Sequence, residues 1–422
     1  MSLLSLIMTK SKLIAAIDIG SSKIVTLLGQ VRPDNPDQVH VIGVSSISSR
    51  GIRKGQVVNI EEATTSITES IESAERMAGF NLSSAYVSID GSHISSQNSQ
   101  GVVAVSQPHG EIGPDDVRRV LEAARAISLP AATEIIHVIP RSFTVDGQEG
   151  IKDPVGMTGV RLEAGTHIVT GSSGAIKNLQ KCLSDVGCDV AGMVFGGLAG
   201  SYAVLTDTER ELGVVLVDIG AGTTDIAVFV EGALSHSAVL PVGAKNVTND
   251  LAIGLRVSLE SAEKIKIFLE KVNTKDKEDD VDISSLALPE EIKSVSYRTL
   301  VEGIIRPRLN EIFQVIAAEL KLSNLAGLTP AGLVITGGGS MTVGAIDSAK
   351  RVLSMPVRIG FPTGISGLID EIESPAFATS VGLLTYGNKS HESSGVEVPW
   401  NNKFPIKDMV SKIGDLLKSL LP

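Results

Sequence analysis

Two stretches of the sequence place an aspartate shortly before a glycine-rich turn that lies between two apolar runs. Residues 13–28 read LIAAIDIGSSKIVTLL, and residues 214–230 read VVLVDIGAGTTDIAVFV. Glycine lets the backbone approach a ligand closely, and successive N–H groups in such a turn form a concavity that binds anions. A carboxylate at the end of a strand suits hydrated Mg²⁺. Each stretch therefore predicts a β-hairpin whose tip binds a phosphate group.

The two turns supply hydroxyl groups and one lysine in addition to their backbone donors. The candidate phosphate-binding residues are Gly20, Ser21, Ser22 and Lys23 in the first turn and Gly220, Gly222, Thr223 and Thr224 in the second. Asp18 and Asp218 are the candidates for holding Mg²⁺ through water. Because the same design occurs twice, we expect two facing lobes that bind one nucleotide between them.

The composition narrows the class of protein. A chain of 422 residues is too long for one ordinary core, so two or more domains are expected. Aromatic residues make up 3%, which argues against a surface that stacks bases or sugars, and the net charge of −11 argues against nucleic acid as a partner. The two cysteines, Cys182 and Cys188, are expected to be reduced. Residues 1–8 lack the basic start of a secretory signal, and no apolar run is long enough to span a membrane, so a cytoplasmic protein is expected.

The order of the predicted elements indicates an internal duplication within an α/β fold. After the first hairpin come a strand at 39–48 and a helix at 60–77 with apolar residues at helical spacing. After the second hairpin come a strand at 238–241 and a helix at 247–255. This repeated β-β-β-α order supports two related lobes.

Between the two copies lies a segment with its own pattern. Strands are predicted at 85–89 and 101–105, an amphipathic helix at 115–127, and a strand or hairpin at 134–145. These elements predict a small inserted α+β subdomain. A strand at 166–171 is then expected to return to the first lobe.

Two helices rich in small residues are predicted at 193–205 and 376–384. Each glycine costs a helix about 1 kcal/mol relative to alanine, which is tolerable where two helices must cross closely. We expect these helices to cross and join the lobes as a hinge, with ordinary core packing as the alternative.

The second half contains three further features. A helix at 258–271 carries Glu263 and Lys266 one turn apart, which by themselves indicate no more than a surface ion pair. A long helix at 297–322 must bend or break at Pro307. A strand at 333–336 then runs into the glycine turn Gly337, Gly338, Gly339 and Ser340, which opens onto a helix at 343–353.

The last segment reads as a polar linker, 387–399, followed by an amphipathic helix, 400–422. Aromatic residues at its start and aliphatic residues on one face suit the interface of an anionic membrane. The residues predicted to enter the membrane are Trp400, Phe404, Ile406, Met409, Val410, Ile413, Leu416, Leu417, Leu420 and Leu421. The alternative is that this segment docks on its own globular part or on a partner helix.

These motifs resemble the actin/Hsp70/sugar-kinase superfamily and, within it, the bacterial cell-division FtsA family. The resemblance rests on the two aspartate-glycine turns, the Thr336-Gly337-Gly338-Gly339 junction, the small-residue helices, the terminal helix, and residues 153–163 (DPVGMTGVRLE), 197–213 (GLAGSYAVLTDTERELG) and 217–228 (VDIGAGTTDIAV). It implies an actin-like two-lobed fold with duplicated βββαβα cores. It further implies ATP and Mg²⁺ in the cleft, with Glu263, Lys266 and the turn 337–340 on the adenosine side.

The resemblance also implies a division of the chain into parts. These are a first lobe (1–84 and 166–195), an inserted subdomain for interaction and polymerisation (85–165), a second lobe (196–242 and 307–386), a small subdomain that docks an FtsZ peptide (243–306), a flexible linker (387–399) and a membrane-targeting helix (400–422). A loose match adds Arg306, Arg308 and Asn310 as contacts for the C-terminal peptide of FtsZ, with solvated helix residues as the alternative.

The implied role is to tether FtsZ polymers to the cytoplasmic face of the plasma membrane at the division septum, to self-associate into actin-like filaments and to recruit later division proteins. Two alternatives stay open, an actin-like pilus-assembly protein of the PilM type and a small-molecule kinase. Related enzymes carry an acid or amide at the start of the connecting helix, where Phe195 aligns in this chain, and nothing nearby replaces it. We therefore expect ATP binding with slow hydrolysis at most, and assign no catalytic residue.

Overall fold

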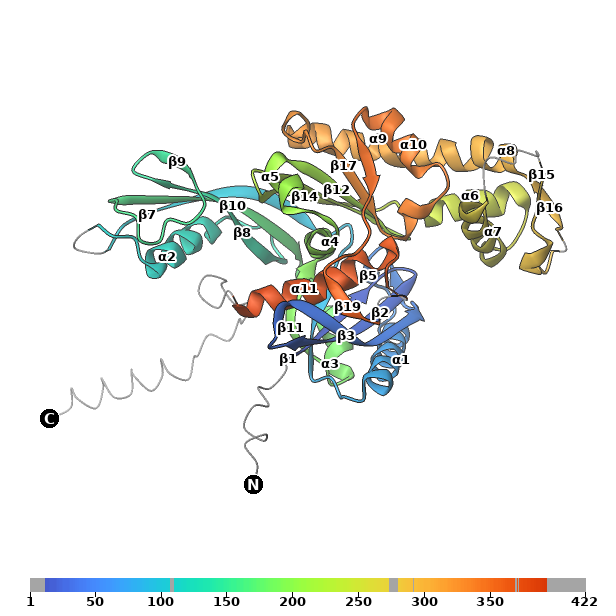
Figure 1. The fold of residues 1–422 in the computed structure, drawn as a ribbon, viewed down its shortest axis with the longest axis horizontal. Helices are drawn as coiled ribbons and strands as arrows, with labels where there is room; N and C mark the ends of the chain where they lie inside the picture. The colour runs from blue at the N-terminus through green and yellow to red at the C-terminus, as the bar shows by residue number, and fades with distance from the viewer. Residues whose placement is uncertain are drawn as a thin grey trace, which may run out of the picture.

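Two β-sheets with related topology form the centre of the molecule (Figure 1). The computed structural model describes residues 12–106, 110–272, 280–290, 292–368, 370 and 372–392. The first sheet has the order β11-β6-β1-β2-β3-β19, with β1 Lys12–Ile19, β2 Lys23–Arg32, β3 Asn35–Ser48, β6 Ser84–Ile89, β11 Asp189–Phe195 and β19 Ile365–Gly367. The second has the order β14-β13-β12-β17-β18, with β12 Val214–Ile219, β13 Thr224–Val230, β14 Ala233–Leu240, β17 Leu333–Thr336 and β18 Val357–Ile359.

Each sheet is built around one central strand that pairs on both sides. β1 forms an antiparallel hairpin with β2 and pairs in parallel with β6, and β12 does the same with β13 and β17. Every residue of β12 is buried, as expected for a strand covered on both faces. The predicted α/β duplication is therefore confirmed by the strand order.

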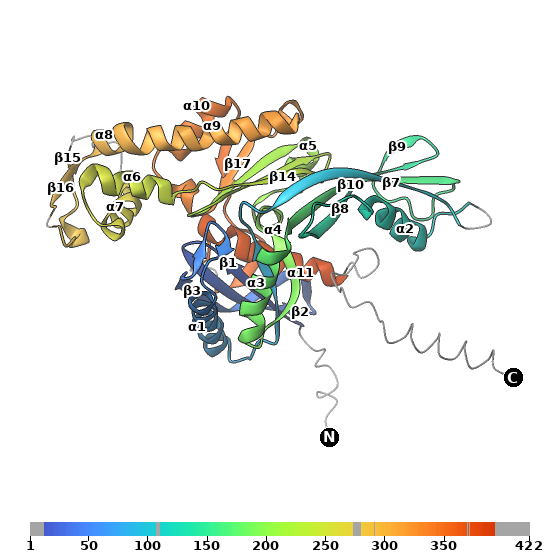
Figure 2. The same ribbon diagram turned by 180° about the vertical axis from the view of Figure 1, so that it is seen from behind.

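Helices cover both sheets and fill the space between them. α1 Ile60–Ala78 and α3 Ser173–Asp185 pack on the first lobe, and α9 Arg306–Ser323 and α10 Ala345–Leu353 pack on the second (Figure 2). α4 Gly196–Val204 and α11 Ala378–Glu392 cross each other between the two sheets. The crossing is so close that a Cβ on Gly382 would overlap the carbonyl oxygen of Ala199. These small-residue helices therefore meet as predicted.

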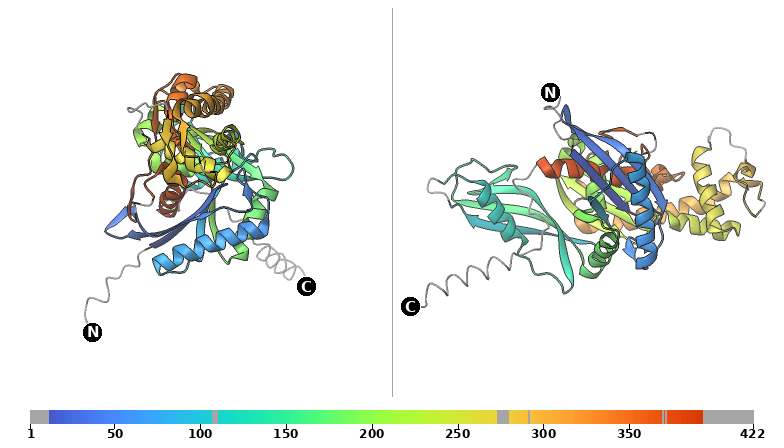
Figure 3. Two further views of the ribbon diagram at one scale, coloured as in Figure 1. Left: turned by 90° about the vertical axis from the view of Figure 1, so that its right-hand side faces the viewer. Right: turned by 90° about the horizontal axis from the view of Figure 1, so that it is seen from below.

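The inserted subdomain and a small subdomain of the second lobe lie at opposite ends of the molecule (Figure 3). The inserted sheet has the order β7-β10-β8-β9, and α2 packs on it around its own apolar cluster. Its elements are β7 Ser95–Ala104, α2 Pro114–Arg125, β8 Thr133–Val145, β9 Gln148–Ile151 and β10 Arg161–Ser172. The small subdomain contains α6 Lys245–Leu255, α7 Leu259–Lys271, β15 Asp280–Asp282, β16 Ser294–Ser296 and α8 Tyr297–Leu300.

Three short elements complete the description. The hairpin of β4 Ile52–Arg53 and β5 Gln56–Val57 follows β3, and α5 Asp207–Leu212 follows α4. Between α8 and α9 a π-helical turn, Val301–Ile305, interrupts the long helix just before Pro307, as the proline predicted. In the part of the chain that the structure describes, every helix is too short or too polar to cross a bilayer.

Two strands belong to a different sheet from the one that we expected. The strand expected at 85–89 in the inserted subdomain is β6, which pairs with β1 through Ala16–Tyr86 and Ile17–Val87. The strand expected at 166–171 in the first lobe is the second half of β10, which pairs with β7 and β8 of the inserted sheet. Both errors concern long-range strand pairing, which local patterning does not specify.

Two helix boundaries also differ. Residues 193–195 are the end of β11, because they pair in parallel with β6, and helix α4 begins only at Gly196. Residues 387–392, expected in a linker, continue α11. Asn388 is buried and donates to the carbonyl oxygen of Pro36 at 2.7 Å, so tertiary contacts override weak helix propensity here. The rest of the expected linker and the helix at 400–422 lie outside the described residues.

Candidate nucleotide-binding site

A cavity of about 680 Å³ lies between the two lobes and collects most of the predicted site residues. The predicted residues that line it are Asp18, Gly20, Ser21, Ser22, Lys23, Asp218, Gly220, Thr223, Glu263, Lys266, Gly337, Gly338 and Gly339. They come from both hairpin turns, from α7 and from the turn after β17. The volume lies in the range of small-molecule sites in proteins.

The two hairpin turns have the same hydrogen-bonded geometry. The Gly20 N–H donates to the Lys23 carbonyl at 3.0 Å, and the Gly220 N–H donates to the Thr223 carbonyl at 2.9 Å. A Cβ on Gly20 would lie 2.9 Å from the Lys23 carbonyl oxygen, so the turn requires glycine there. Successive N–H groups in glycine turns of this kind can form a concavity that binds an anion.

The charged groups of the turns are buried. Burial raises the pKa of Asp18, and it raises the pKa of Asp218 to about 6. Hydroxyl donors orient both carboxylates, Ser88 for Asp18 and Thr379 for Asp218, each at 2.8 Å. Burial also lowers the pKa of Lys23 to about 8, although the two aspartates oppose this change. A negatively charged ligand carrying a cation would compensate these buried charges on both sides.

Two further acids line the same cavity, and the sequence analysis missed them. Asp90 follows β6 and accepts a hydrogen bond from the Gly196 N–H at 2.8 Å, at the start of α4. Asp225 lies on β13, directly opposite Asp218 in the antiparallel register. Burial and the neighbouring Asp90 raise the pKa of Asp225 well above its ordinary value, and burial raises the pKa of Asp90 to about 7. Each of the two carboxyl groups therefore takes up a proton more readily than an ordinary aspartate.

Asp90 corrects the expectation about the start of the connecting helix. Phe195 is completely buried and only its N–H is used, as a donor to His137 Nε2 at 3.0 Å. Burial lowers the pKa of His137 to about 4, so the ring is neutral and can accept this bond. An acid does lie at the start of this helix, but it is Asp90, which follows β6, and not residue 195. In the sequence, the aspartate directly after the apolar run 85–89 could have indicated this acid.

On the opposite side of the cavity, α7 contributes an ordered polar pair. Lys266 Nζ lies 2.8 Å from Glu263 Oε2 and donates to the Thr248 hydroxyl at 3.0 Å. Lys266 is almost fully buried, so this pair is more than the surface ion pair that spacing alone indicates. Gly337 adopts φ +79°, and a Cβ there would overlap Asp218 Oδ1. The turn after β17 thus lies directly against the metal-side aspartate.

Three predicted residues do not line the cavity. Thr224 is buried and its hydroxyl donates to the Val242 carbonyl at 2.8 Å. Ser340 is buried and its hydroxyl donates to the Gly337 carbonyl at 2.7 Å. Gly222 lies in an adjacent groove, where a Cβ would be 2.8 Å from the Ser21 hydroxyl. These residues shape the turns without reaching into the cavity.

The residues predicted to meet an FtsZ peptide lie in the first two turns of α9, and both arginines form ion pairs with neighbouring acids. Arg308 makes a two-point ion pair with Asp250 at 2.5 and 3.1 Å and a third contact with Glu311. Arg306 pairs with Glu302 one turn earlier. The Asn310 side-chain oxygen is buried and has no hydrogen-bond partner within the described structure.

The donor set of the cavity fits a nucleotide with a divalent cation. Seven acidic side chains, including Asp18, Asp90, Asp218 and Asp225, line the cavity with three lysines, so a bound cation would help to balance the acids when they ionise. Among the described residues no three His, Cys, Asp or Glu side chains gather closely enough to hold a metal directly. A divalent cation bound here would be held through its own water shell.

The duplicated sheets, the crossing helices between them and the cleft define an actin-like fold. Solved structures agree: the PilM-PilN type IV pilus biogenesis complex matches with a TM-score of 0.62 and 17% identity, covering 89% of this chain and 98% of that chain. MreB5 of Spiroplasma citri bound to AMPPNP matches with a TM-score of 0.53 and 13% identity, covering 90% and 98%. At these identities the likeness concerns the fold alone.

Sequence comparison then identifies the family. The family model described as the SHS2 domain inserted in FTSA matches residues 91–170, and the model for cell division protein FtsA matches residues 215–382. Cell division protein FtsA of Pseudomonas aeruginosa is 44% identical over 380 residues, 89% of each chain. That of Escherichia coli K12 is 37% identical over 423 residues, 98% of this chain and 97% of the relative.

The chain belongs to the cell division protein FtsA family. It is an actin-like cell-division protein, which decides against the pilus-assembly and kinase alternatives that the motifs left open.

Proposed function

We propose that this protein is an ATP- and Mg²⁺-binding scaffold that polymerises and tethers FtsZ filaments to the cytoplasmic face of the plasma membrane. It also helps to recruit later division proteins at the septum. The observation that carries the nucleotide part is the cleft in which both lobes place a phosphate turn and an aspartate around one cavity. The membrane part rests on the amphipathic pattern of residues 400–422.

In the cleft, each part of the chain has a distinct task. The N–H groups of the two turns bind the phosphates, and Lys23 adds a positive charge. Asp18 and Asp218 hold the waters around Mg²⁺, which when bound neutralises phosphate charge. Glu263 and Lys266 contact the adenosine side. Because the two turns belong to different lobes, bound nucleotide fixes the angle between the lobes and thereby controls filament assembly.

Slow hydrolysis at most is still expected, for a reason that the structure supplies. Asp90 lines the cleft together with the two turns, but its carboxylate already accepts from the Gly196 N–H, and its raised pKa of about 7 favours the protonated form. A general base must be free to take a proton from the attacking water. Sustained phosphate release of several turnovers per second by purified protein would contradict this expectation.

Nucleotide binding is tested by calorimetry with ATP in the presence of Mg²⁺ and again with a chelator. We expect binding with Mg²⁺ and a marked loss of affinity without it, because the buried carboxylates then repel the phosphates. Equal affinity under both conditions would remove Mg²⁺ from the proposal.

Membrane tethering is tested by flotation with liposomes that contain anionic lipid. The full chain is expected to float, and a chain ending at residue 399 is expected to remain in the lower fractions. Neutral liposomes serve as the control for the lysines of the segment. Flotation of the truncated chain to the same extent would disprove tethering by residues 400–422.

Docking of the FtsZ C-terminal peptide on the small subdomain is tested by co-sedimentation. Arg308→Glu is expected to weaken co-sedimentation, since it reverses a charge that an acidic peptide would meet. Because Arg308 also pairs with Asp250, the variant needs a check of its unfolding temperature. Arg351→Glu on the exposed face of α10 is the charge-matched control and is expected to bind normally.

A further inference from the structure

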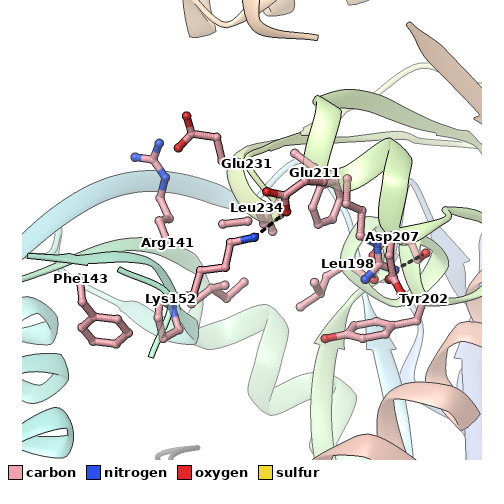
Figure 4. A pocket seen from close by; sticks show the side chains of 16 residues that line it. Arg141, Phe143, Lys152, Leu198, Tyr202, Asp207, Glu211, Glu231 and Leu234 are labelled. Atoms are coloured by element: carbon pink, nitrogen blue, oxygen red, sulfur yellow. Dashed lines mark hydrogen bonds and ion pairs between the residues drawn. The ribbon is translucent and has the colours of Figure 1, made fainter. Parts of the chain in front are cut away.

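A second cavity, of about 430 Å³, lies between the inserted subdomain and the second lobe. Its walls come from β8, the end of β9, α4, α5 and the β13–β14 turn. Figure 4 shows Lys152 reaching from the inserted sheet toward Glu211 of α5, where the two side chains form an ion pair of 2.6 Å. The cavity therefore lies at a junction between two parts of the fold, apart from the nucleotide cleft.

The chemistry of this cavity favours an aromatic or aliphatic side chain with charges beside it. Phe143, Leu198 and Leu234 form apolar walls. The guanidinium group of Arg210 lies 5.0 Å from the ring centre of Tyr202, so that an aromatic ring and a cation already stack at one side. Such a pocket, apolar inside and charged at its rim, is typical of sites that receive an anchor side chain from a peptide.

The described chain ends beside this cavity. Near the end of α11, Lys389 Nζ lies 5.3 Å from the centre of the Tyr202 ring, and the Tyr386 ring lies 5.6 Å from it. Tyr202 itself lines the cavity. The described part of α11 therefore ends next to the cavity.

We propose that this cavity binds the chain's own segment 400–404, with Trp400 or Phe404 as the inserted anchor. Seven residues lie between Glu392 and Trp400, and the eight steps from one to the other can span about 26 Å, which is ample from the end of α11. The segment reads WNNKF and supplies the only tryptophan of the chain. Trp and Phe bury large areas at little conformational cost, which makes them suitable anchors.

The size of the cavity selects this segment over the helix that follows it. A helix with side chains is about 10–12 Å wide, and residues 406–421 would form one about 24 Å long. Such a body exceeds a cavity of 430 Å³, whereas one aromatic side chain fits.

Charge also agrees with an extended segment at this place. Lys403 lies between the two aromatic residues, and the rim offers the exposed acids Asp207 and Glu231. Glu397 precedes the anchor, and Arg141 lies on the opposite wall. Lys403 of the segment and Glu397 before it would each find an opposite charge when the segment docks.

Docking has a regulatory consequence that rests on the function proposed above. Trp400 and Phe404 belong to the segment that is proposed to enter the membrane, so one molecule cannot use them in both places at once. Anionic lipid would then release the segment from the cavity. Docking itself, however, is independent of lipid and can be tested without it.

The experiment measures acrylamide quenching of Trp400 fluorescence in the full chain without lipid. We expect quenching roughly threefold weaker than in a free peptide of residues 393–422, as two-thirds occupancy of the cavity implies. Ile139→Asp, at a half-buried wall position, and Ala233→Phe, which fills the cavity, are both expected to restore peptide-like quenching. Val102→Asp, on the exposed side of the inserted sheet, is the matched control and is expected to retain protection.

Three results would overturn the proposal. These are peptide-like quenching in the unmodified chain, protection that survives both cavity variants, and protection that disappears on dilution, which would assign the contact to a second copy. A chain lacking residues 1–11 is expected to keep the protection, and loss of protection there would assign the anchor site to the N-terminal segment instead. Because flotation tests membrane tethering separately, failure of either idea leaves the other assessable.

Discussion

The two phosphate turns have the same backbone but different side chains, and the difference divides the chemistry of the cleft between the lobes. Position 23 of the first turn is lysine, whereas the equivalent position of the second is Thr223. Opposite the metal-side aspartate, the first hairpin has Val25 and the second has Asp225. A duplicated scaffold thus supplies a cation from one side and an acid from the other.

The strands that pair in parallel with the two hairpins differ in a complementary way. Asp90 directly follows β6 in the first lobe and Gly337 directly follows β17 in the second, although the strand registers make Ile89 the counterpart of Gly337. The second lobe cannot carry a side chain there, because it would overlap Asp218. The first lobe thus carries an acid just beyond its strand, whereas the second lobe keeps glycine at Gly337. Asp90 and Asp225 come from different lobes and line the same cavity.

The largest effect is expected from adding a side chain at Gly337 in the second lobe. Gly337→Ala places a Cβ at φ +79° against Asp218 and should lower the free energy of unfolding by about 3 kcal/mol. ATP binding should become undetectable by calorimetry. Gly338→Ala is the matched control, since its Cβ would meet only Ala376 at 3.6 Å. Equal behaviour of the two variants would contradict the asymmetry at this turn.

Making the first turn resemble the second is expected to have the next largest effect. Lys23→Thr removes a charge-assisted contact to phosphate and should weaken ATP binding by about 2 kcal/mol. Because the pKa of Lys23 is about 8, the affinity of the unmodified protein should fall as pH rises through that value. The variant should lack this pH dependence, and a pH profile that stays unchanged would assign the titration to another group.

Replacing Asp90 by asparagine should stabilise the nucleotide-free protein. The pKa of Asp90 is raised to about 7, so the native state binds more protons than the unfolded state between its ordinary value and pH 7. Its stabilising contribution is present at acid pH and is lost as pH rises through about 7. Asp90→Asn should therefore raise the free energy of unfolding by at least about 1.5 kcal/mol at pH 8 and leave it almost unchanged near pH 4. Urea unfolding at both pH values measures this difference in the free energy of unfolding. A loss of stability in the variant at pH 8 would argue against a raised pKa of Asp90.

The smallest effect is expected on the adenosine side. Lys266→Ala removes a buried ammonium group held by Glu263 and Thr248 and should weaken ATP binding by about 1 kcal/mol. Lys264→Ala, two residues away, removes an exposed pair with Glu260 and should change binding by less than about 0.5 kcal/mol. Similar losses in both variants would indicate a general charge effect rather than a contact in the cleft.

The sequence pattern correctly predicted those structural features that depend on a few neighbouring residues. The aspartate-glycine turns, the kink before Pro307 and the small-residue helices each depend on a few adjacent residues, and the structure has all three. Strand pairing was less reliable: 85–89 and 166–171 were both recognised as strands but assigned to the wrong sheets. An apolar run does not specify which strand it pairs with, since many partner strands would bury it equally well.

What the sequence by itself determined is the pair of phosphate turns and the lobes around them, because glycine, aspartate and flanking apolar runs act over a few residues. Only the tertiary structure revealed the acid pair, because Asp90 and Asp225 lie on strands of different lobes and meet across the cleft. It likewise placed the end of α11 beside Tyr202 and a cavity that no local pattern indicates. Long-range packing brings such groups together, and their burial, which sets their chemistry, exists only after folding.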